Sequence, residues 1–273
     1  MGRAARSRPH RDGAALPARC DAAGSGRAGV TALEHRVRAL NEPGSPNLVH
    51  DDEFARRLGF RSGLVPGVAV YGYMAVLPAR LWGDLWLAGG AMSARFLKPV
   101  YDGEQVIVRA SAAGEGLDLE LRNPAGELCA SGHAEPTARG PSPRLERYHA
   151  APLPIPARPP LFEEQQPLGS LSTSVHLSDH AWPARLANEV LMANIQLPPW
   201  LHVESRARHL ARVRDGERAE VRAVVAALWE RRGHRFVDLD VLVLGENANP
   251  VAQLRHVAIY EMAQLRAGGP TTD

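Results

Sequence analysis

The chain has 273 residues, and its 32 basic and 30 acidic side chains leave a formal charge of only +2. This balance excludes a global field for binding nucleic acid or another polyanion. No apolar run approaches the roughly 20 residues of a membrane-spanning helix. Cys20 and Cys129 lie far apart and lack metal-ligand spacing, so we expect no disulfide framework and predict a reducing, cytoplasmic location.

The first part of the chain leads from a tail into a strand and a loop. Residues 1–28 are rich in arginine, alanine, glycine and proline without periodicity, which predicts a disordered tail. Residues 30–40 partly alternate between apolar and polar side chains and are predicted as the first strand. The turn-rich loop 41–46 (NEPGSP) then leads to a cluster of polar residues.

Residues 47–74 (NLVHDDEFARRLGFRSGLVPGVAVYGYM) place a histidine close to the start of an apolar helix. The polar cluster consists of Asn47, His50, Asp51 and Asp52. A short helical turn and a glycine-rich loop follow, and Pro66-Gly67 then heads an apolar run that extends to about residue 81. A helix that is apolar all round is a buried helix. The N–H groups of its first turn have no intrahelical partner, so they can hold a carbonyl oxygen that becomes negative during a reaction.

The rest of the chain repeats this plan. Residues 91–135 alternate and are broken by Asp-Gly and Pro-x-Gly turns, which predicts an antiparallel meander. A proline-rich linker is expected at 137–168. The segment KPVYDGEQVIVRA (98–110) then aligns without gaps with ARVRDGERAEVRA (211–223), 113 residues later. Residues 182–195 take the place of the buried helix, and three strand candidates follow. We therefore predict two similar halves, 29–136 and 169–265, and a tail at 266–273.

The segment 47–74 resembles the MaoC-like, (R)-specific enoyl-CoA hydratase family of the hotdog fold, over about 28 residues. That family's signature reads D-x-N-P-[IL]-H-x-D, then A, G-F and H-G-M. The residues at matching spacings are Asn47, His50, Asp52, Ala55, Gly59, Phe60 and Gly67. Ser45 stands where the family has its catalytic aspartate, Leu48 replaces the proline, and Pro66 replaces the histidine of H-G-M. The resemblance implies an α+β double hotdog, with two antiparallel sheets that each wrap a central helix.

The resemblance also suggests which residues act on a substrate. His50 is the candidate general acid and base, because histidine exchanges protons near neutrality. Asn47 would orient it, Ser45 would hold a water, and the Gly67 amide would stabilise an oxyanion, although a glycine there also permits close packing. Asp51 or Glu42 would supply the missing carboxylate; Asp52 is expected to cap the helix that starts near it. The candidate substrate-binding residues are Asp52, Gly63, Val65, Pro66 and Tyr71. Tyr71 is equally compatible with core packing, and Gly63 with turn geometry.

Three functions agree with these residues. The first is hydration or dehydration of a 2-enoyl or 3-hydroxyacyl thioester on coenzyme A or acyl carrier protein. The second is a hotdog that binds an acyl thioester or small apolar ligand without turnover, and the third is a thioesterase that uses Asp51. We expect no metal and no cofactor apart from the thioester carrier. Because one chain supplies both halves, we expect a monomeric pseudo-dimer or a homodimer.

Overall fold

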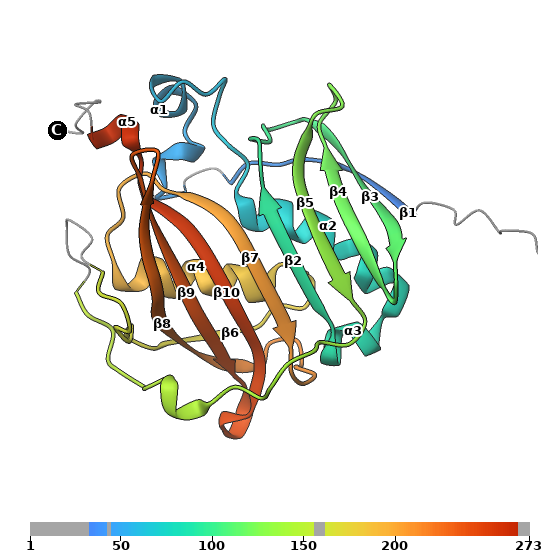
Figure 1. The fold of residues 1–273 in the computed structure, drawn as a ribbon, viewed down its shortest axis with the longest axis vertical. Helices are drawn as coiled ribbons and strands as arrows, with labels where there is room; N and C mark the ends of the chain where they lie inside the picture. Colours follow the sequence, from blue (N-terminus) through green and yellow to red (C-terminus); the bar gives the residue numbers. More distant parts are fainter. Residues whose placement is uncertain (1–32, 43–44, 156–161, 267–273) are drawn as a thin grey trace, which may run out of the picture. The chain divides into compact units, whose positions relative to one another are not determined.

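Ten antiparallel strands form one continuous sheet in the computed structural model, which describes residues 33–42, 45–155 and 162–266 (Figure 1). The first half contributes β1 (Leu33–Arg38), β2 (Ala91–Phe96), β3 (Gln105–Ala113), β4 (Gly116–Arg122) and β5 (Leu128–Glu135). The second contributes β6 (Leu171–Ser174), β7 (Leu201–His209), β8 (Arg218–Arg231), β9 (His234–Leu244) and β10 (Pro250–Glu261). The helices are α1 (Asp52–Arg57), α2 (Gly67–Trp82), α3 (Asp84–Gly89), α4 (Trp182–Asn194) and α5 (Ala263–Arg266). Short 3-10 turns are η1 (Leu48–His50), η2 (Leu145–Arg147) and η3 (Glu246–Ala248).

The strand order shows the internal repeat. It runs β1-β3-β4-β5-β2-β7-β10-β9-β8-β6, so each half has the same order and the two halves meet where β2 pairs with β7. The Asp-Gly turns that precede β3 and β8 contain Gly103 and Gly216, with φ of 75° and 74°. A positive φ is readily adopted only by glycine, which explains why the repeat retains it. The predicted α+β double hotdog is confirmed, with one correction: the two expected sheets are joined into one.

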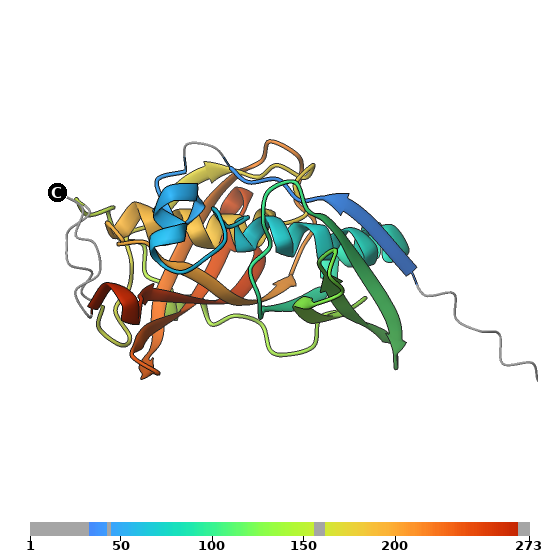
Figure 2. The same cartoon turned by 90° about the horizontal axis from the view of Figure 1, so that it is seen from above.

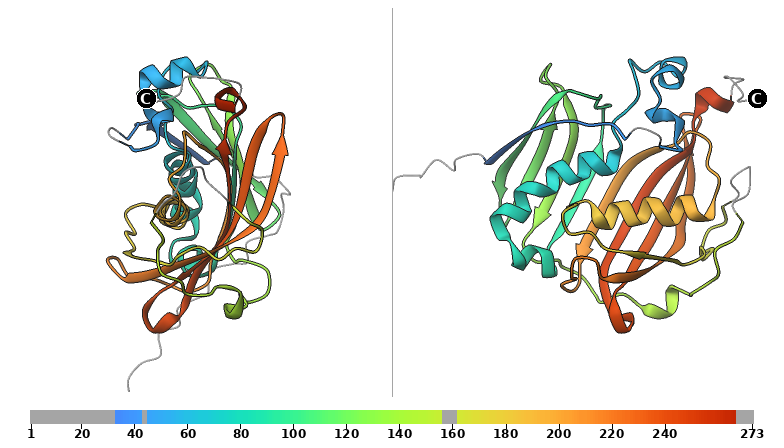
Figure 3. Two further views of the ribbon diagram at one scale, coloured as in Figure 1. Left: turned by 90° about the vertical axis from the view of Figure 1, so that its left-hand side faces the viewer. Right: turned by 180° about the vertical axis from the view of Figure 1, so that it is seen from behind.

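The two long helices cover one face of this sheet. α2 and α4 lie end to end along the concave side, with the strands curving around them (Figures 2 and 3). Each buries apolar side chains against its own half, and a single core cluster contains residues from both halves. The halves therefore share one hydrophobic core. None of the helices in the described residues is long and apolar enough to cross a lipid bilayer.

Several local predictions differ from the structure. α3 and β6 were not expected, because α3 has only six residues and β6 is the short polar segment LSTS. The buried helix, expected to extend to about residue 81, continues as α2 to Trp82 with Pro78 inside it, and it ends at Gly83 with φ of 51°. The predicted tail 1–28 and residues 267–273 lie outside the described residues, as does part of the predicted linker, 156–161.

The linker is fastened to the outer face of the second half. Tyr148, which is 2% exposed, packs in a small cluster with residues of β8 and β9. Its hydroxyl donates a 2.7 Å hydrogen bond to Oδ1 of Asp240 on β9. Asp240 is 4% exposed and also accepts a bond from Gln253 at 3.1 Å. A buried carboxylate needs such donors, because an unpartnered buried charge is strongly destabilising.

Candidate active site

A cavity of about 310 Å³ opens where the two halves meet, at the end of the sheet where β2 ends and β7 begins. In Figure 1, α1 lies at this same end of the sheet. The first half lines the cavity with the polar cluster, the start of α2 and the segment after β2, including Asn47, His50, Gly67 and Lys98. The second half adds Asn188 from α4 and the start of β7. Both halves are therefore needed to enclose it.

His50 lines this cavity, and its two ring nitrogens have different partners. It ends η1, and its Nδ1 lies 2.6 Å from the carbonyl oxygen of Leu64. A carbonyl only accepts, so Nδ1 carries the proton and donates it, which leaves Nε2 as the acceptor nitrogen of the neutral ring, 3.5 Å from Nδ2 of Asn47. Burial lowers the pKa of His50 below its usual value, and this outweighs the raising effects of the Leu64 carbonyl and the charge of Glu42. At neutral pH His50 is thus a neutral ring that can accept a proton.

Asn47 connects His50 to the second half. Its Oδ1 accepts hydrogen bonds from the backbone N–H of Trp200 at 3.2 Å and of Val49 at 3.4 Å. Its Nδ2 donates to the Trp200 carbonyl at 2.9 Å and lies 3.5 Å from Nε2 of His50. The side chain is only 7% exposed. Asn47 therefore fixes the polar cluster against the residue that precedes β7.

Gly67 is the first residue of α2, and its position is tightly confined. The helix begins after Pro66, whose carbonyl accepts from the N–H groups of Ala69 and Val70. Within the described residues, no acceptor for the Gly67 N–H is present. A Cβ atom on Gly67 would lie 2.8 Å from Nδ1 of His202, which is closer than real contacts allow. The absence of a side chain thus lets a helix N-terminus and a β7 side chain meet at the cavity wall.

Among the other predicted catalytic residues, Ser45 and Asp51 do not line the cavity. The Ser45 hydroxyl accepts a 3.3 Å bond from the backbone N–H of Asn47. Asp51 is the N-cap residue of α1, and its Oδ1 accepts a 2.8 Å hydrogen bond from the N–H of Phe54. The cap expected at Asp52 is therefore made by its neighbour, because Asp51 has the extended backbone of a capping residue.

The predicted substrate-binding residues divide into two groups. Val65 and Pro66 line the cavity. Asp52, Gly63 and Tyr71 lie outside its lining. Asp52 accepts a 2.9 Å bond from the Gly63 N–H, and a Cβ on Gly63 would lie 2.2 Å from the His50 carbonyl oxygen. Asp52 therefore holds Gly63, and the absence of a side chain at Gly63 leaves room for the His50 carbonyl. Tyr71 is 1% exposed, and its hydroxyl donates to the Met92 carbonyl at 3.4 Å.

Two side chains of the second half reach the cavity without having been predicted. Asn188 lines it, and its Oδ1 is buried without a partner within the described residues. His202 stacks on His256 with ring centroids 4.2 Å apart, and its Nε2 lies 2.8 Å from the Ser205 hydroxyl. Burial lowers the pKa of His202 well below its usual value, so this ring is neutral. Nothing in the sequence distinguishes Asn188 from the other polar residues of α4, which are Arg185, Glu189 and Asn194.

The cavity contains no acidic side chain. Among the described residues that line it, none is an aspartate or glutamate. The charge of Glu42 acts to raise the pKa of His50 but does not offset the lowering by burial, and the Glu42 carboxylate forms an ion pair with Arg185 at 2.9 Å. No group of three or more potential metal ligands occurs in the described part of the chain. A carboxylate partner for the His50 ring is therefore absent from the described lining.

No protein-family model matches the sequence, and no curated protein matches it. Solved structures do match the fold. A MaoC domain dehydratase from Chloroflexus aurantiacus has a TM-score of 0.54 and 11% identity, over 85% of this chain and 95% of that chain. A double-hotdog protein from Mycobacterium tuberculosis has a TM-score of 0.52 and 15% identity, over 78% of this chain and 87% of that chain. The dehydratase domain of PpsC from the same organism, in complex with C12:1-CoA, has a TM-score of 0.51 and 12% identity, over 85% of this chain and 93% of that chain. At these identities the likeness concerns the fold, and the chain is a double hotdog.

Proposed function

We propose that this chain adds water to, or removes it from, the 2,3-bond of an acyl thioester carried on coenzyme A or acyl carrier protein. The observation that carries the proposal is that His50 and Gly67, the first residue of α2, line one cavity. A base and an amide donor at one site are what this reaction needs. The dehydratases of similar fold, one of them bound to an acyl-CoA, support this substrate class.

In the hydration direction, the thioester carbonyl oxygen accepts a hydrogen bond from the Gly67 N–H. The positive end of the α2 dipole stabilises the negative charge that develops on this oxygen. Nε2 of His50 takes a proton from water while the water oxygen bonds to C3, and electrons move onto the carbonyl to form an enolate. The imidazolium then returns the proton to C2. We expect the Asn188 side chain, whose buried Oδ1 has no partner within the described residues, to turn toward the cavity and accept a hydrogen bond from the attacking water.

His50 acts here as the only acid and base. The position that holds an aspartate in the resembled family is Ser45, which bonds to the Asn47 backbone outside the cavity lining. The same imidazole therefore has to accept and return the proton, as the reaction above allows. Its lowered pKa favours the base form at neutral pH. We expect the hydration rate to fall with acidification, with a midpoint below the usual histidine value.

A second candidate function is binding of an acyl thioester without turnover. The observation that favours it is the absence of an acidic side chain among the described residues of the cavity lining. A thioesterase has less support, because the carboxylate of Asp51 caps α1 and does not line the cavity.

The test is hydration of crotonyl-CoA by the purified protein, followed by loss of enone absorbance. We expect His50→Gln to reduce the rate by about 10²-fold or more, as removal of a general base does. Replacement of the exposed His149 by Gln is the matched control and should leave the rate unchanged. Absence of hydration, combined with protection from thermal unfolding by crotonyl-CoA, would refute the hydratase and favour binding without turnover. Release of free thiol would instead indicate a thioesterase.

A further inference from the structure

A second hollow, which we call the outer basin, lies beside the cavity. It has a volume of about 440 Å³ and is formed by β2, β7, β8, β9 and β10. Phe96, Val203 and Ile259 line both the outer basin and the cavity. The two hollows therefore adjoin at the end of the sheet where β2 ends and β7 begins. A ligand whose reactive end occupies the cavity can extend into the outer basin.

Positive charge exceeds negative charge in the outer basin. Four arginines line it, Arg95, Arg206, Arg231 and Arg255, against only two carboxylates, Glu204 and Asp238. Arg206 and Arg95 share Glu204, at 2.5 and 3.7 Å, and Arg255 pairs with Asp238. Arg231 has no ion pair within the described residues. The described lining thus has an excess of two positive charges.

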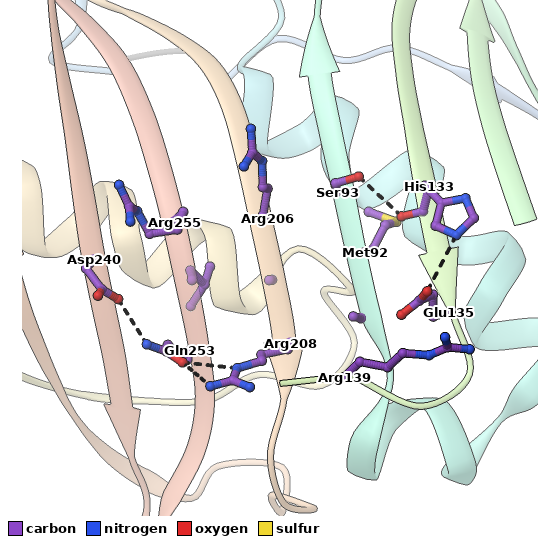
Figure 4. Close-up of a pocket in the computed structure, with 13 residues that line it drawn as sticks. Met92, Ser93, His133, Glu135, Arg139, Arg206, Arg208, Asp240, Gln253 and Arg255 are labelled. Atoms are coloured by element: carbon purple, nitrogen blue, oxygen red, sulfur yellow. Dashed lines mark hydrogen bonds and ion pairs between the residues drawn. The ribbon is translucent and has the colours of Figure 1, made fainter. Parts of the chain in front are cut away.

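Two of these arginines lie directly opposite each other, and the carboxylates that pair with them, Glu204 and Asp238, leave the lining with an excess of positive charge. Arg206 on β7 and Arg255 on β10 are directly paired across the strands. Figure 4 shows both side chains on the face of the sheet opposite α4. Like charges directly opposite each other on neighbouring strands destabilise a sheet. Arg206 and Arg255 also line a further hollow on the same face of the sheet, next to the outer basin. Arg208 and Arg139 add two more guanidinium groups there. Guanidinium groups bind phosphate through two parallel hydrogen bonds.

An aromatic surface borders the same charges. Trp229 on β8 and Phe236 on β9 stack with centroids 5.1 Å apart and an angle of 8° between the rings. Trp229 is 39% exposed, which is unusual for so large an apolar side chain. A flat exposed aromatic face next to guanidinium groups is the combination that binds a nucleobase and its phosphates.

We propose that the outer basin binds the adenosine 3′,5′-bisphosphate end of coenzyme A, with adenine on Trp229 and the phosphates on the arginines. This inference rests on the proposed function, because it names the carrier of the thioester held in the cavity. Arg206 lies four residues along β7 from His202, roughly 13 Å at the usual strand rise. The pantetheine arm spans that interval, past the shared apolar residues, and brings the thioester to Gly67.

Direct binding of 3′,5′-ADP, measured by calorimetry at low salt, tests the site without any chemistry. We expect Arg231→Gln to weaken its binding about tenfold, as loss of one charge-assisted phosphate contact does. Arg218→Gln is the matched control, because Arg218 is exposed at the opposite end of the same strand. Trp229→Ala should weaken the binding of 3′,5′-ADP but not of inorganic pyrophosphate. Undetectable binding of 3′,5′-ADP, or equal binding by wild type and Arg231→Gln, would overturn the proposal.

Kinetics separate the failure of this inference from the failure of the proposed function. For crotonyl-CoA we expect Arg231→Gln to raise KM about tenfold with little change in kcat, while KM for crotonyl-pantetheine stays the same. Nucleotide binding without any hydration would retain the site and reject the hydratase. Hydration with the same KM for both thioesters would retain the hydratase and reject the site. A KM effect confined to a carrier-protein thioester would reject the nucleotide and assign the basic surface to carrier protein.

Discussion

Acidification should destabilise this protein at a pH where its carboxylates are still ionised. His256 is fully buried and His209 is 4% exposed, and each has one ring nitrogen without a partner within the described residues. Burial lowers the pKa of His256 from 6.5 to about 3 and that of His209 to about 4. Both rings are therefore neutral in the folded protein, whereas in the unfolded chain each takes up a proton below about pH 6.5.

The sign and size follow from proton linkage. Between about pH 6.5 and the folded-state pKa values, the unfolded chain binds more protons, so the free energy of unfolding falls as the pH falls. At pH 5, which is about 1.5 units below the unfolded pKa, each histidine lowers the free energy of unfolding by roughly 2 kcal/mol. The pair lowers it by roughly 4 kcal/mol. The depressed carboxylate pKa values, such as that of Glu217, lower stability only below their unfolded value of 4.5. From pH 6.5 to 5 the loss therefore comes from the buried histidines, while Glu189, whose pKa is raised by burial, changes the free energy of unfolding in the opposite direction.

Urea unfolding followed by tryptophan fluorescence, at several pH values from 7.5 to 5, measures this loss. His256→Asn should be less stable at pH 7.5, yet lose roughly 2 kcal/mol less than wild type on acidification. His149→Asn is the control, since His149 is exposed and should leave the pH dependence unchanged. A free energy of unfolding that is constant from pH 7.5 to 5, or an unaltered slope in His256→Asn, would refute the reasoning.

Two substitutions test the packing of the site and of the linker. Gly67→Ala places a Cβ 2.8 Å from Nδ1 of His202, so we expect a loss of about 1–3 kcal/mol in the free energy of unfolding, measured by urea titration; unchanged stability would show that the His202 ring can move away. Tyr148→Phe removes the 2.7 Å donor to the buried Asp240 carboxylate, and we expect a loss of about 1–3 kcal/mol in the same assay. A smaller effect of Tyr148→Phe in an Asp240→Asn background than in wild type would identify the lost charge stabilisation; equal effects in the two backgrounds would contradict it.

The fold was predictable because the same local sequence patterns, an apolar helix followed by alternating strands and Asp-Gly turns, occur twice in the chain. The turns at Gly103 and Gly216 have nearly the same positive φ, and the strands that follow them occupy equivalent places in the sheet. The joining of β2 to β7 was not predictable in detail, because nothing local in either strand specifies its partner. Short elements such as β6 have too few residues for their pattern to be distinguished from a loop.

The site was only partly predictable, for a related reason. His50 and Gly67 are 17 residues apart in one motif, and both line the cavity. Asn188 and His202 come from the other half, and only tertiary folding brings them to the same cavity. The carboxylates near His50 in sequence bind backbone N–H groups instead of lining the cavity: Asp51 accepts from Phe54 and Asp52 from Gly63. Proximity in sequence therefore overestimated the number of acidic groups at the site.

The seam between β2 and β7 also determines how this cavity responds to dilution. When two separate chains enclose a site, mass action separates them at low concentration and the site is lost. Here the linker keeps the two halves at a high effective concentration, and the seam forms within one chain. The cavity should therefore persist at nanomolar protein, and its ligand affinity should not depend on protein concentration.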